Sequence, residues 1–391
     1  MPATAIYASR ILTPQEEISD GVILVEGSRI TAVGHRDEVR VPAGAKDYVA
    51  TGMTVTPGFV DVHIHGAGGH DVMEGSDAAL DRITSTVARY GTTSMLATTV
   101  TAPADDTRKS LEKIARYIRS RENAEAHPQL AAEIVGIHLE GPFISKIRRG
   151  VHPTESLAKP SIELFEEFLK AAEGRVKMLT VAPELPGALE LIERAVAHHI
   201  VAGLGHTDAE YEQARAGIRA GASHAVHMFN GMRPFSHRDP GVIGAVLTDP
   251  DVTAEIIADG VHVAGPAIQV LLLAKGLDQV LLVSDGTSAT GMRDGTYRLG
   301  NLQVNVVDGV VRNAEGKLAG STLTLDRALR TVVALGVPLI DAVRMATLLP
   351  ARRLSLAGKK GIIAVGADAD IVALTPELRV TGVMTRGHGL S

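Results

Sequence analysis

The chain has 391 residues, contains no cysteine or tryptophan, and carries a formal net charge of −6. The mild negative charge does not indicate nucleic-acid binding, and the lack of cysteine excludes disulfides and thiolate metal ligands. There is no apolar run of about 18 residues and no basic-then-apolar leader. We therefore expect no membrane span, no signal peptide and a cytoplasmic location.

Both ends of the chain alternate short β-like runs with turns. We predict that residues 1–56 and 357–391 meet in one small β-sandwich domain, and that residues 57–356 form a separate domain between them. The terminal runs are Ala5–Tyr7, Gly21–Val25, Arg29–Val33, Asp47–Thr51, Ala369–Leu374 and Val380–Thr385.

The central domain opens with the apolar run 57–62, which leads into His63 and His65. Side chains at i and i+2 lie on the same face of a strand, so the two imidazoles can converge on one point, as metal ligands must. A chance pair of histidines is the alternative, and this segment alone does not decide between the two interpretations.

Four further apolar runs end in a residue that can bind a metal or move a proton. These residues are Glu140, His206, His227 and Asp285. Between these runs, apolar residues recur at the spacing of a helix over 105–120, 161–173, 266–276 and 321–336. A capping-box pair, Thr207 and Glu210, predicts another helix through Ala220. Strands that alternate with helices and carry chemistry at their ends are typical of a (β/α)₈ TIM barrel, an α/β fold.

The ordered motifs of the central domain resemble those of the amidohydrolase superfamily, and within it the family of N-acetylglucosamine-6-phosphate deacetylases. Each motif alone is weak, but the ordered set is specific and extends from about residue 50 to the C-terminus. The motifs are His-Leu-Glu-Gly-Pro-Phe at 138–143, Gly-Val-His-Pro at 150–153, Gly-His-Thr at 205–207, His-Met-Phe-Asn-Gly-Met at 227–232, Arg-Asp-Pro-Gly at 238–241, Asp-Gly-Val-His at 259–262, Ser-Asp-Gly at 284–286 and Leu-Ala-Gly-Ser at 318–321.

The resemblance implies a hydrolase that binds one or two divalent metal ions per subunit, with Zn²⁺ favoured and Fe²⁺, Mn²⁺ or Co²⁺ also compatible with the ligands. Glu140, His206 and His227 are the expected metal ligands, and a turn carboxylate is the alternative for Glu140. His63 and His65 are expected to bind a second ion, or else to hydrogen-bond beside a single one. His224 has the wrong parity on its strand and should face away from the metal.

The resemblance also implies the catalytic groups and the substrate. Asp285 is expected to be the general acid and base, with a helix N-cap as the alternative, and His152 to polarise the acetyl carbonyl. The expected reaction is hydrolysis of the acetamide of N-acetyl-D-glucosamine 6-phosphate. Further substrate-binding residues are expected at Val151, Asn230, Gly231, Arg238, His262, Leu318, Ala319 and Gly320.

The family resemblance further implies a homodimer in which Arg238 reaches the neighbouring active site, although a solvated loop charge is the alternative for this arginine. The basic loop of Lys146, Arg148 and Arg149 is either a phosphate-attracting lid or a soluble loop. Three other functions stay open: deacetylation of the galactosamine epimer, hydrolysis of a cyclic amide, and a non-catalytic scaffold.

Overall fold

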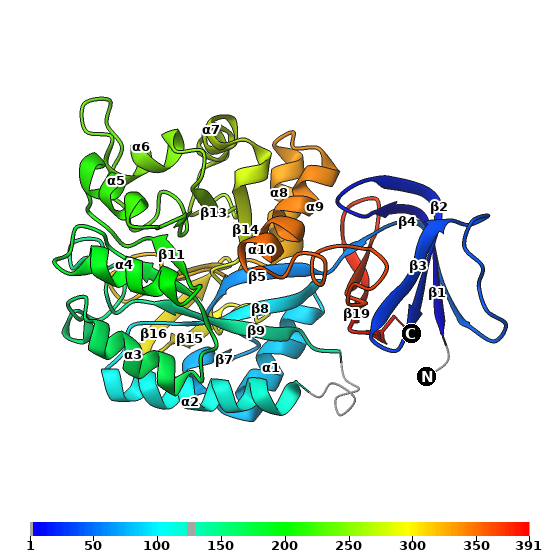
Figure 1. Cartoon of the computed structure of the whole chain (residues 1–391), viewed down its shortest axis with the longest axis horizontal. Coiled ribbons are helices and arrows are strands. Elements are labelled where there is room, and N and C mark those ends of the chain that lie inside the picture. The colour runs from blue at the N-terminus through cyan, green and yellow to red at the C-terminus, as the bar shows by residue number, and fades with distance from the viewer. Residues whose placement is uncertain (1–2, 123–129, 391) are drawn as a thin grey trace.

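The computed structural model describes residues 3–122 and 130–390. It places a helix-covered barrel beside a smaller β domain, and both chain ends lie at the β domain (Figure 1). Residues 1, 2 and 391 of the predicted β domain lie outside the described residues.

The barrel is a parallel sheet of eight strands in the order β14-β13-β12-β11-β10-β9-β8-β5. Helices alternate with these strands, so the predicted α/β fold, a (β/α)₈ barrel, is confirmed. The strands are β5 (Phe59–Ile64), β8 (Thr92–Thr99), β9 (Glu133–Glu140), β10 (Val176–Val181), β11 (Val201–Leu204), β12 (His224–Ala225), β13 (Thr253–Ile257) and β14 (Val280–Val283). The helices are α1 (Asp77–Ala88), α2 (Ala104–Arg121), α3 (Ile162–Ala171), α4 (Ala188–Ala197), α5 (Tyr211–Arg219), α6 (Gly241–Thr248), α7 (Gly265–Lys275), α8 (Leu325–Ala334), α9 (Leu339–Ala346) and α10 (Leu348–Arg353).

The first and last barrel strands close the ring just where the predicted site lies. The backbone N–H of Asp285 donates to the carbonyl of His63 at 2.9 Å, and that of His65 donates to Gly286 at 2.8 Å. These bonds fix the end of β5 against the end of β14, so His63, His65 and Asp285 are positioned by the same closure.

Local chemistry explains the helices that were predicted from spacing. In α3, Ser161 caps the first turn by accepting from the N–H of Leu164 at 3.2 Å, and Phe165 and Phe168 are buried against the barrel. The predicted capping box of Thr207 with Glu210 is wrong. Thr207 instead donates to Glu184 at 2.6 Å, and the helix begins one turn later at a box formed by Glu210 and Gln213.

Seven terminal strands form one mixed sheet, in the order β20-β19-β18-β4-β1-β2-β3. The first strand pairs in parallel with β4, and β4 pairs antiparallel with β18, so the two chain ends are joined by a hydrogen-bonded ladder. The expected small β domain built from both termini is thus present, while its boundaries at 56 and 357 stay a prediction. Its strands are β1 (Thr4–Leu12), β2 (Glu17–Glu26), β3 (Arg29–His35), β4 (Lys46–Pro57), β18 (Ile371–Leu374), β19 (Val380–Thr385) and β20 (His388–Gly389).

A three-stranded antiparallel sheet between β14 and α8 was not predicted from the sequence. Its buried side chains, among them Leu299 and Val304, pack with Val100 of the barrel, and Asp71 accepts from the N–H of Gly300 at 2.8 Å. This sheet therefore covers part of the barrel mouth. Its strands are β15 (Gly295–Leu299), β16 (Leu302–Val307) and β17 (Val310–Arg312); the remaining short elements are β6 (Gly66–Ala67), β7 (His70–Asp71), η1 (Val72–Glu74), η3 (Thr154–Ser156) and η4 (Leu277–Gln279).

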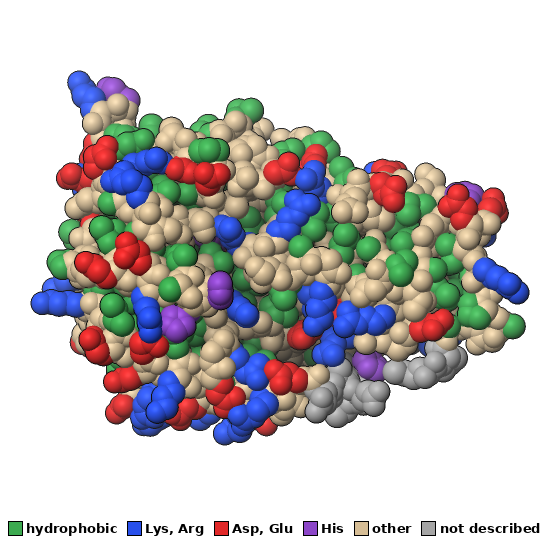
Figure 2. Space-filling model, in the orientation of Figure 1, with side chains coloured by type: hydrophobic (Ala, Val, Ile, Leu, Met, Phe, Trp, Pro, Cys, Tyr) green, Lys and Arg blue, Asp and Glu red, His purple; other side chains and the backbone are tan. Residues whose placement is uncertain are grey.

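Acidic and basic side chains are interspersed over the face of the molecule shown in Figure 2. Among the helices that the structure describes, none has both the length and the apolar character needed to cross a membrane.

A buried ion cluster joins the β domain to the barrel. The ammonium group of Lys360 lies 2.6 Å from Glu133 at the start of β9, 2.9 Å from Asp368 and 2.8 Å from Asp370, and its side chain is 1% exposed. Burying carboxylates without a counter-charge is costly, so this lysine compensates charge from both parts of the chain.

Lys360→Met is therefore expected to lower stability by about 3–5 kcal/mol, because it leaves buried carboxylates without their main partner. Thermal unfolding of the variant measures the loss. Lys359→Met is the matched control, since that side chain is exposed next door in the sequence and should change stability by less than about 0.5 kcal/mol. Equal unfolding temperatures for the two variants would show that the cluster does not hold the two parts together.

Candidate active site

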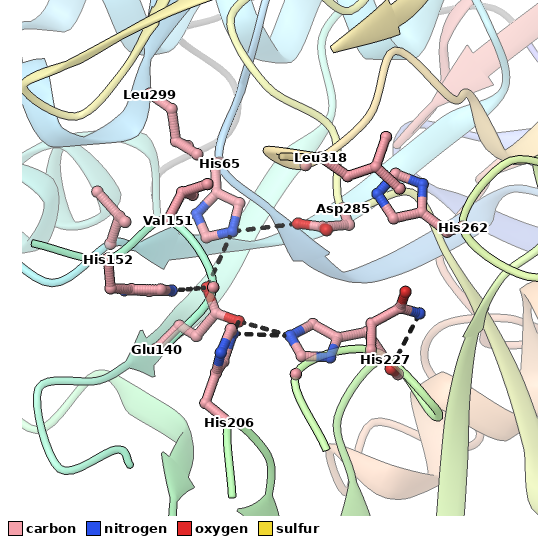
Figure 3. A pocket seen from close by; sticks show the side chains of 15 residues that line it. His65, Glu140, Val151, His152, His206, His227, His262, Asp285, Leu299 and Leu318 are labelled. Atoms are coloured by element: carbon pink, nitrogen blue, oxygen red, sulfur yellow. Dashed lines mark hydrogen bonds and ion pairs between the residues drawn. The ribbon is translucent and has the colours of Figure 1, made fainter. Parts of the chain in front are cut away.

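The side chains predicted to bind metal come from the carboxyl ends of different barrel strands and meet at one point. Figure 3 shows His65, His206 and His227 directed at Glu140, with Asp285 next to His65. Parity on the strands explains this arrangement, because β5 and β9 turn these side chains towards the barrel axis.

Glu140 is the centre of the cluster. Its Oε1 atom lies 3.3 Å from Nε2 of His63, 3.2 Å from Nε2 of His206 and 3.0 Å from Nε2 of His227. Its Oε2 atom lies 3.2 Å from Nε2 of His65. All four predicted histidine ligands are thus within reach of the fifth predicted ligand, Glu140.

Asp285 lies beside the same cluster, with its Oδ1 atom 3.3 Å from Nε2 of His65 and 3.7 Å from Nε2 of His63. Burial raises the pKa of this carboxyl, but the hydrogen bond to His65 and the nearby histidine charges lower it below its ordinary value overall. The group is consequently ionised near neutral pH and able to accept a proton.

Three of these residues have strained backbones at the point where their strands end. The φ angles are 47° for His206, 30° for His227 and 49° for Asp285, all in the left-handed region that such residues rarely occupy. Conformations of this kind cost about 1–3 kcal/mol each and concentrate at functional sites. The chain therefore gives up stability to direct these side chains into the barrel mouth.

The donor set fits a bound cation. Nε2 of His206 and Nε2 of His227 face each other at 3.1 Å while both approach the same oxygen of Glu140. Because the carbonyl of Arg148 accepts from Nδ1 of His206, Nε2 of His206 carries a lone pair 3.2 Å from an oxygen of Glu140, and these two acceptors repel unless a positive charge lies near them. The carboxylates supply the negative charge that a cation needs. Burial lowers the pKa of His65, yet hydrogen bonds with Asp285 and Glu140 outweigh it and raise the pKa to about 9.

The ligand atoms also group at metal-binding distances. His63, Glu140 and His227 form one such group, His63, His65 and Asp285 a second, and Glu140, His152 and His206 a third. Nitrogen and carboxylate oxygen suit Zn²⁺ and its neighbours in the first transition series. The ligand role of each residue stays a prediction.

His152 is held in one tautomer. Its Nδ1 atom accepts from the N–H of Thr101 at 3.3 Å and lies 2.8 Å from the Thr101 hydroxyl, so the proton resides on Nε2. Burial is the main cause that lowers the pKa of His152 to about 4, which keeps the ring neutral. Nε2 lies 3.5 Å from Oε2 of Glu140, so the N–H of this neutral imidazole is at the edge of the ligand cluster, where it can donate to a substrate oxygen.

The site opens into a cavity of about 640 Å³, a volume that includes the open solvent at its mouth. Of the predicted substrate-binding residues, Ala319 is buried in the core of the covering sheet and Arg238 is exposed in the segment 233–240 before α6, so neither lines this cavity. Their binding roles stay predictions. The predicted residues that line it are Val151, His152, Asn230, Gly231, His262, Leu318 and Gly320.

Two lining glycines have structural reasons for their identity. Gly231 has φ of 60°, and a Cβ atom there would lie 2.8 Å from Nδ1 of His206. Gly320 also has φ of 60°, and its Cβ would lie 2.9 Å from the carbonyl of Asp285. A larger residue at either position would displace a group of the site.

His262 is oriented by Asp259, whose role was not predicted. The two side chains meet at 2.7 Å, and Asp259 also accepts from the backbone N–H groups of Val261 and His262. Burial lowers the pKa of His262, but the hydrogen bond and charge of Asp259 raise it overall. His262 therefore favours its cationic form more than a free imidazole does.

A buried polar layer beneath the site was missed by the sequence reasoning. Glu255 of β13 hydrogen-bonds His63 and His224, and Asp61 accepts from the backbone N–H of His63 at 3.2 Å. Burial raises the pKa of Asp61 to about 6 despite its hydrogen bonds. The sequence did contain a signal: Glu255 is a carboxylate in the middle of an apolar strand, and it lies on the same face of the strand as Thr253 and Ile257. His224, predicted to face away from the metal, belongs to none of the three ligand groups and contacts Glu255 within this buried layer.

The basic loop after β9 is fixed by its own contacts. Arg148 pairs with Asp208 at 2.7 Å, and its carbonyl lies 2.8 Å from Nδ1 of His206. Arg149 donates to the carbonyl of His152 at 2.6 Å. Both arginines therefore support site histidines from behind, and neither lines the cavity.

Comparisons with known proteins agree with this geometry. Residues 54–389 match the amidohydrolase family. The chain is 37% identical to N-acetylglucosamine-6-phosphate deacetylase from Vibrio furnissii, over 99% of this chain and 94% of that protein. It is 35% identical to N-acetylgalactosamine-6-phosphate deacetylase from Escherichia coli O157:H7, over 98% of each.

A solved structure is similar over the whole fold. It is a mutant of N-acetyl-D-glucosamine-6-phosphate deacetylase from Mycobacterium smegmatis in complex with N-acetyl-D-glucosamine-6-phosphate, with a TM-score of 0.92, 38% identity and full coverage of both chains. The chain therefore belongs to the amidohydrolase family and, within it, to the N-acetylglucosamine-6-phosphate deacetylases.

Proposed function

We propose that this protein hydrolyses the acetamide of N-acetyl-D-glucosamine 6-phosphate to D-glucosamine 6-phosphate and acetate, in the cytoplasm, during amino-sugar catabolism and cell-wall sugar recycling. The observation that carries the proposal is the convergence of Asp285 and four of the five predicted ligands on one cavity, with the fifth, His63, buried against them. A non-catalytic scaffold would have no need to keep this ligand set.

Glu140, His206 and His227 would hold one divalent ion, and His63 with His65 would complete the site for a second ion bridged by Glu140. We favour Zn²⁺, with Fe²⁺, Mn²⁺ or Co²⁺ as ions that the same ligands accept. When bound, the metal supplies a Lewis acid and lowers the pKa of water for attack.

The protein side chains complete the reaction. Asp285 accepts a proton from the attacking water and then delivers it to the leaving nitrogen, because it is ionised and lies next to the ligand cluster. His152 donates its Nε2 proton in a hydrogen bond to the acetyl oxygen as negative charge develops there. The apolar side chains of Val151, Leu299 and Leu318 restrict water around the bound sugar.

The sugar phosphate is proposed to bind His262 in its cationic form, together with Asn230 and the backbone of Gly231. Among the described residues, no lysine or arginine lines the cavity. A dianionic phosphate therefore lacks a full counter-charge within one chain. This supports the proposal of a homodimer in which exposed Arg238 reaches the neighbouring site, where its planar donor fork suits phosphate.

The direct test is acetate release from four substrates: the N-acetylated glucosamine and galactosamine sugars, each with and without the 6-phosphate. We expect fast hydrolysis of N-acetyl-D-glucosamine 6-phosphate and slow hydrolysis of the unphosphorylated sugars. Since one relative is named for the galactosamine epimer, faster hydrolysis of N-acetylgalactosamine 6-phosphate would assign that sugar instead. Hydrolysis of cyclic amides alone would reject both.

Arg238→Ala is expected to lower kcat/KM for the phosphorylated sugar by roughly 10- to 150-fold, since a charge-assisted phosphate contact is worth about 1.5–3 kcal/mol. The unphosphorylated sugar should be affected much less. Arg40→Ala, an exposed arginine of the β domain, is the control and should leave both rates unchanged. An equal loss for both sugars would reject the phosphate contact.

Mixed dimers test whether the contact crosses the subunits. A dimer of one Arg238→Ala chain and one Asp285→Asn chain contains one site with both original residues, if Arg238 acts on its neighbour. Activity of the mixture should then exceed that of either variant. Mixed dimers without such recovery would place Arg238 in its own subunit or outside the reaction.

A further inference from the structure

Glu255 has no role in the reaction described above, yet it is fully buried beneath the ligand cluster. It lies in the middle of β13, and its side chain is directed inward among the ends of β5 and β12. An ionised carboxylate at such a depth is costly unless each oxygen has partners. The partners of Glu255 therefore indicate why it is there.

Both carboxylate oxygens hydrogen-bond either to a predicted ligand residue or to a residue just before one in the chain. Oε2 accepts from Nδ1 of His63 at 2.9 Å and from the backbone N–H of His227 at 3.0 Å. Oε1 lies 2.9 Å from Nε2 of His224, whose Nδ1 atom lies 2.7 Å from the hydroxyl of Thr253. One side chain thus touches ligand residues from two different strands.

The bond to His63 determines which nitrogen of that ring can bind a metal. With the Nδ1 proton donated to Glu255, the lone pair resides on Nε2, which lies 3.3 Å from Glu140 at the cluster centre. The ring is also packed edge-on against His138, with centroids 4.7 Å apart. His227 is held differently, because Glu255 fixes its backbone at the point where φ is strained.

We propose that Glu255 is a positioning residue for metal binding: it sets the tautomer and orientation of His63 and anchors the backbone of His227, so that one buried carboxylate aligns both parts of the metal site. This inference rests on the metal site of the proposed function and assigns a residue that lies outside the ligand set. Groups that hydrogen-bond to ligating histidines typically change metal affinity by about 10- to 100-fold when mutated.

Three variants separate positioning from packing. Glu255→Gln keeps the shape and one acceptor oxygen but removes the charge, so metal affinity should fall by about 10-fold. Glu255→Leu removes both acceptors and should weaken affinity by up to about 100-fold. Thr253→Val is the matched control on the same face of β13: it removes the partner of His224 and leaves the contact of Glu255 with His63 intact.

The measurement is a Zn²⁺ titration of metal-free protein in competition with a chromophoric chelator, together with the visible spectrum of the Co²⁺-loaded protein. We expect weaker binding and an altered Co²⁺ spectrum for Glu255→Gln, wild-type behaviour for Thr253→Val, and metal-free melting temperatures within a few degrees of each other. If Glu255→Leu does not fold, Glu255→Gln carries the test.

Unchanged Zn²⁺ affinity in Glu255→Gln would overturn the inference, as would an equal loss in Thr253→Val, because the effect would then belong to the packing of the whole layer. Failure of the wild-type protein to bind Zn²⁺ or Co²⁺ would instead overturn the proposed metal site, and the inference with it. The two failures are thus distinguishable from the wild-type titration alone.

Discussion

Asp285→Asn is expected to lower kcat by about 10²- to 10⁴-fold, the usual contribution of a general acid and base. The carboxamide cannot accept the proton of the attacking water and cannot return one to the leaving nitrogen. The fold should persist, because asparagine tolerates the left-handed backbone at φ 49° and still offers an oxygen to His65. Steady-state kinetics and a melting curve measure the two effects together.

Asp308→Asn is the matched control for this substitution. Asp308 also has a left-handed backbone, with φ of 52°, but it is exposed in the turn between β16 and β17. It should retain both activity and melting temperature. Near-normal turnover in Asp285→Asn would reject the assigned proton transfer, whereas a large fall in its melting temperature would indicate a structural role.

The positions of the ligand residues could be predicted from the sequence because they follow from strand parity. His63 and His65 share one face of β5, and Glu140 ends β9, so each side chain is directed at the barrel axis by its backbone alone. Parallel strands place these ends at one rim, so their meeting required no further information.

The supporting residues could not be predicted in this way, because their roles depend on contacts between strands distant in sequence. In the sequence Glu255 is an isolated charge in β13, and its partners on β5 and β12 are evident only in the folded structure. Thr101, after β8, fixes the tautomer of His152, which lies 51 residues later in the loop after β9, and nothing in either local sequence indicates the pair. The sheet of β15–β17 was missed for a related reason, since its short strands are stabilised by packing on the barrel mouth.

The capping-box prediction failed because a third residue competed for the same hydroxyl. Thr207 and Glu210 have the required spacing, but the carboxylate of Glu184, from the loop after β10, takes the Thr207 hydroxyl. That bond holds the turn after His206, while the helix is capped later by its own box. Local spacing therefore gave the helix and misplaced its first turn.

Removal of the metal ligands is expected to have the largest effect on the protein's activity. Glu140→Ala and His206→Ala should each abolish hydrolysis, since every predicted ligand nitrogen approaches Glu140 and the two residues are predicted to bind the same ion. Elemental analysis of the purified variants should show loss of metal along with activity. A variant that loses activity yet keeps its full metal content would contradict the ligand role of the replaced residue.

The first histidine pair is expected to behave differently. Changing His63 and His65 together to alanine should lower the metal content from about two ions per chain to about one, because Glu140, His206 and His227 still form a site with three ligands. His70→Ala is the control, since this histidine follows the pair closely in sequence but pairs with Glu74 at the surface. An unchanged metal content in the double variant would show that His63 and His65 are not a ligand pair and would leave them a hydrogen-bonding role beside the metal.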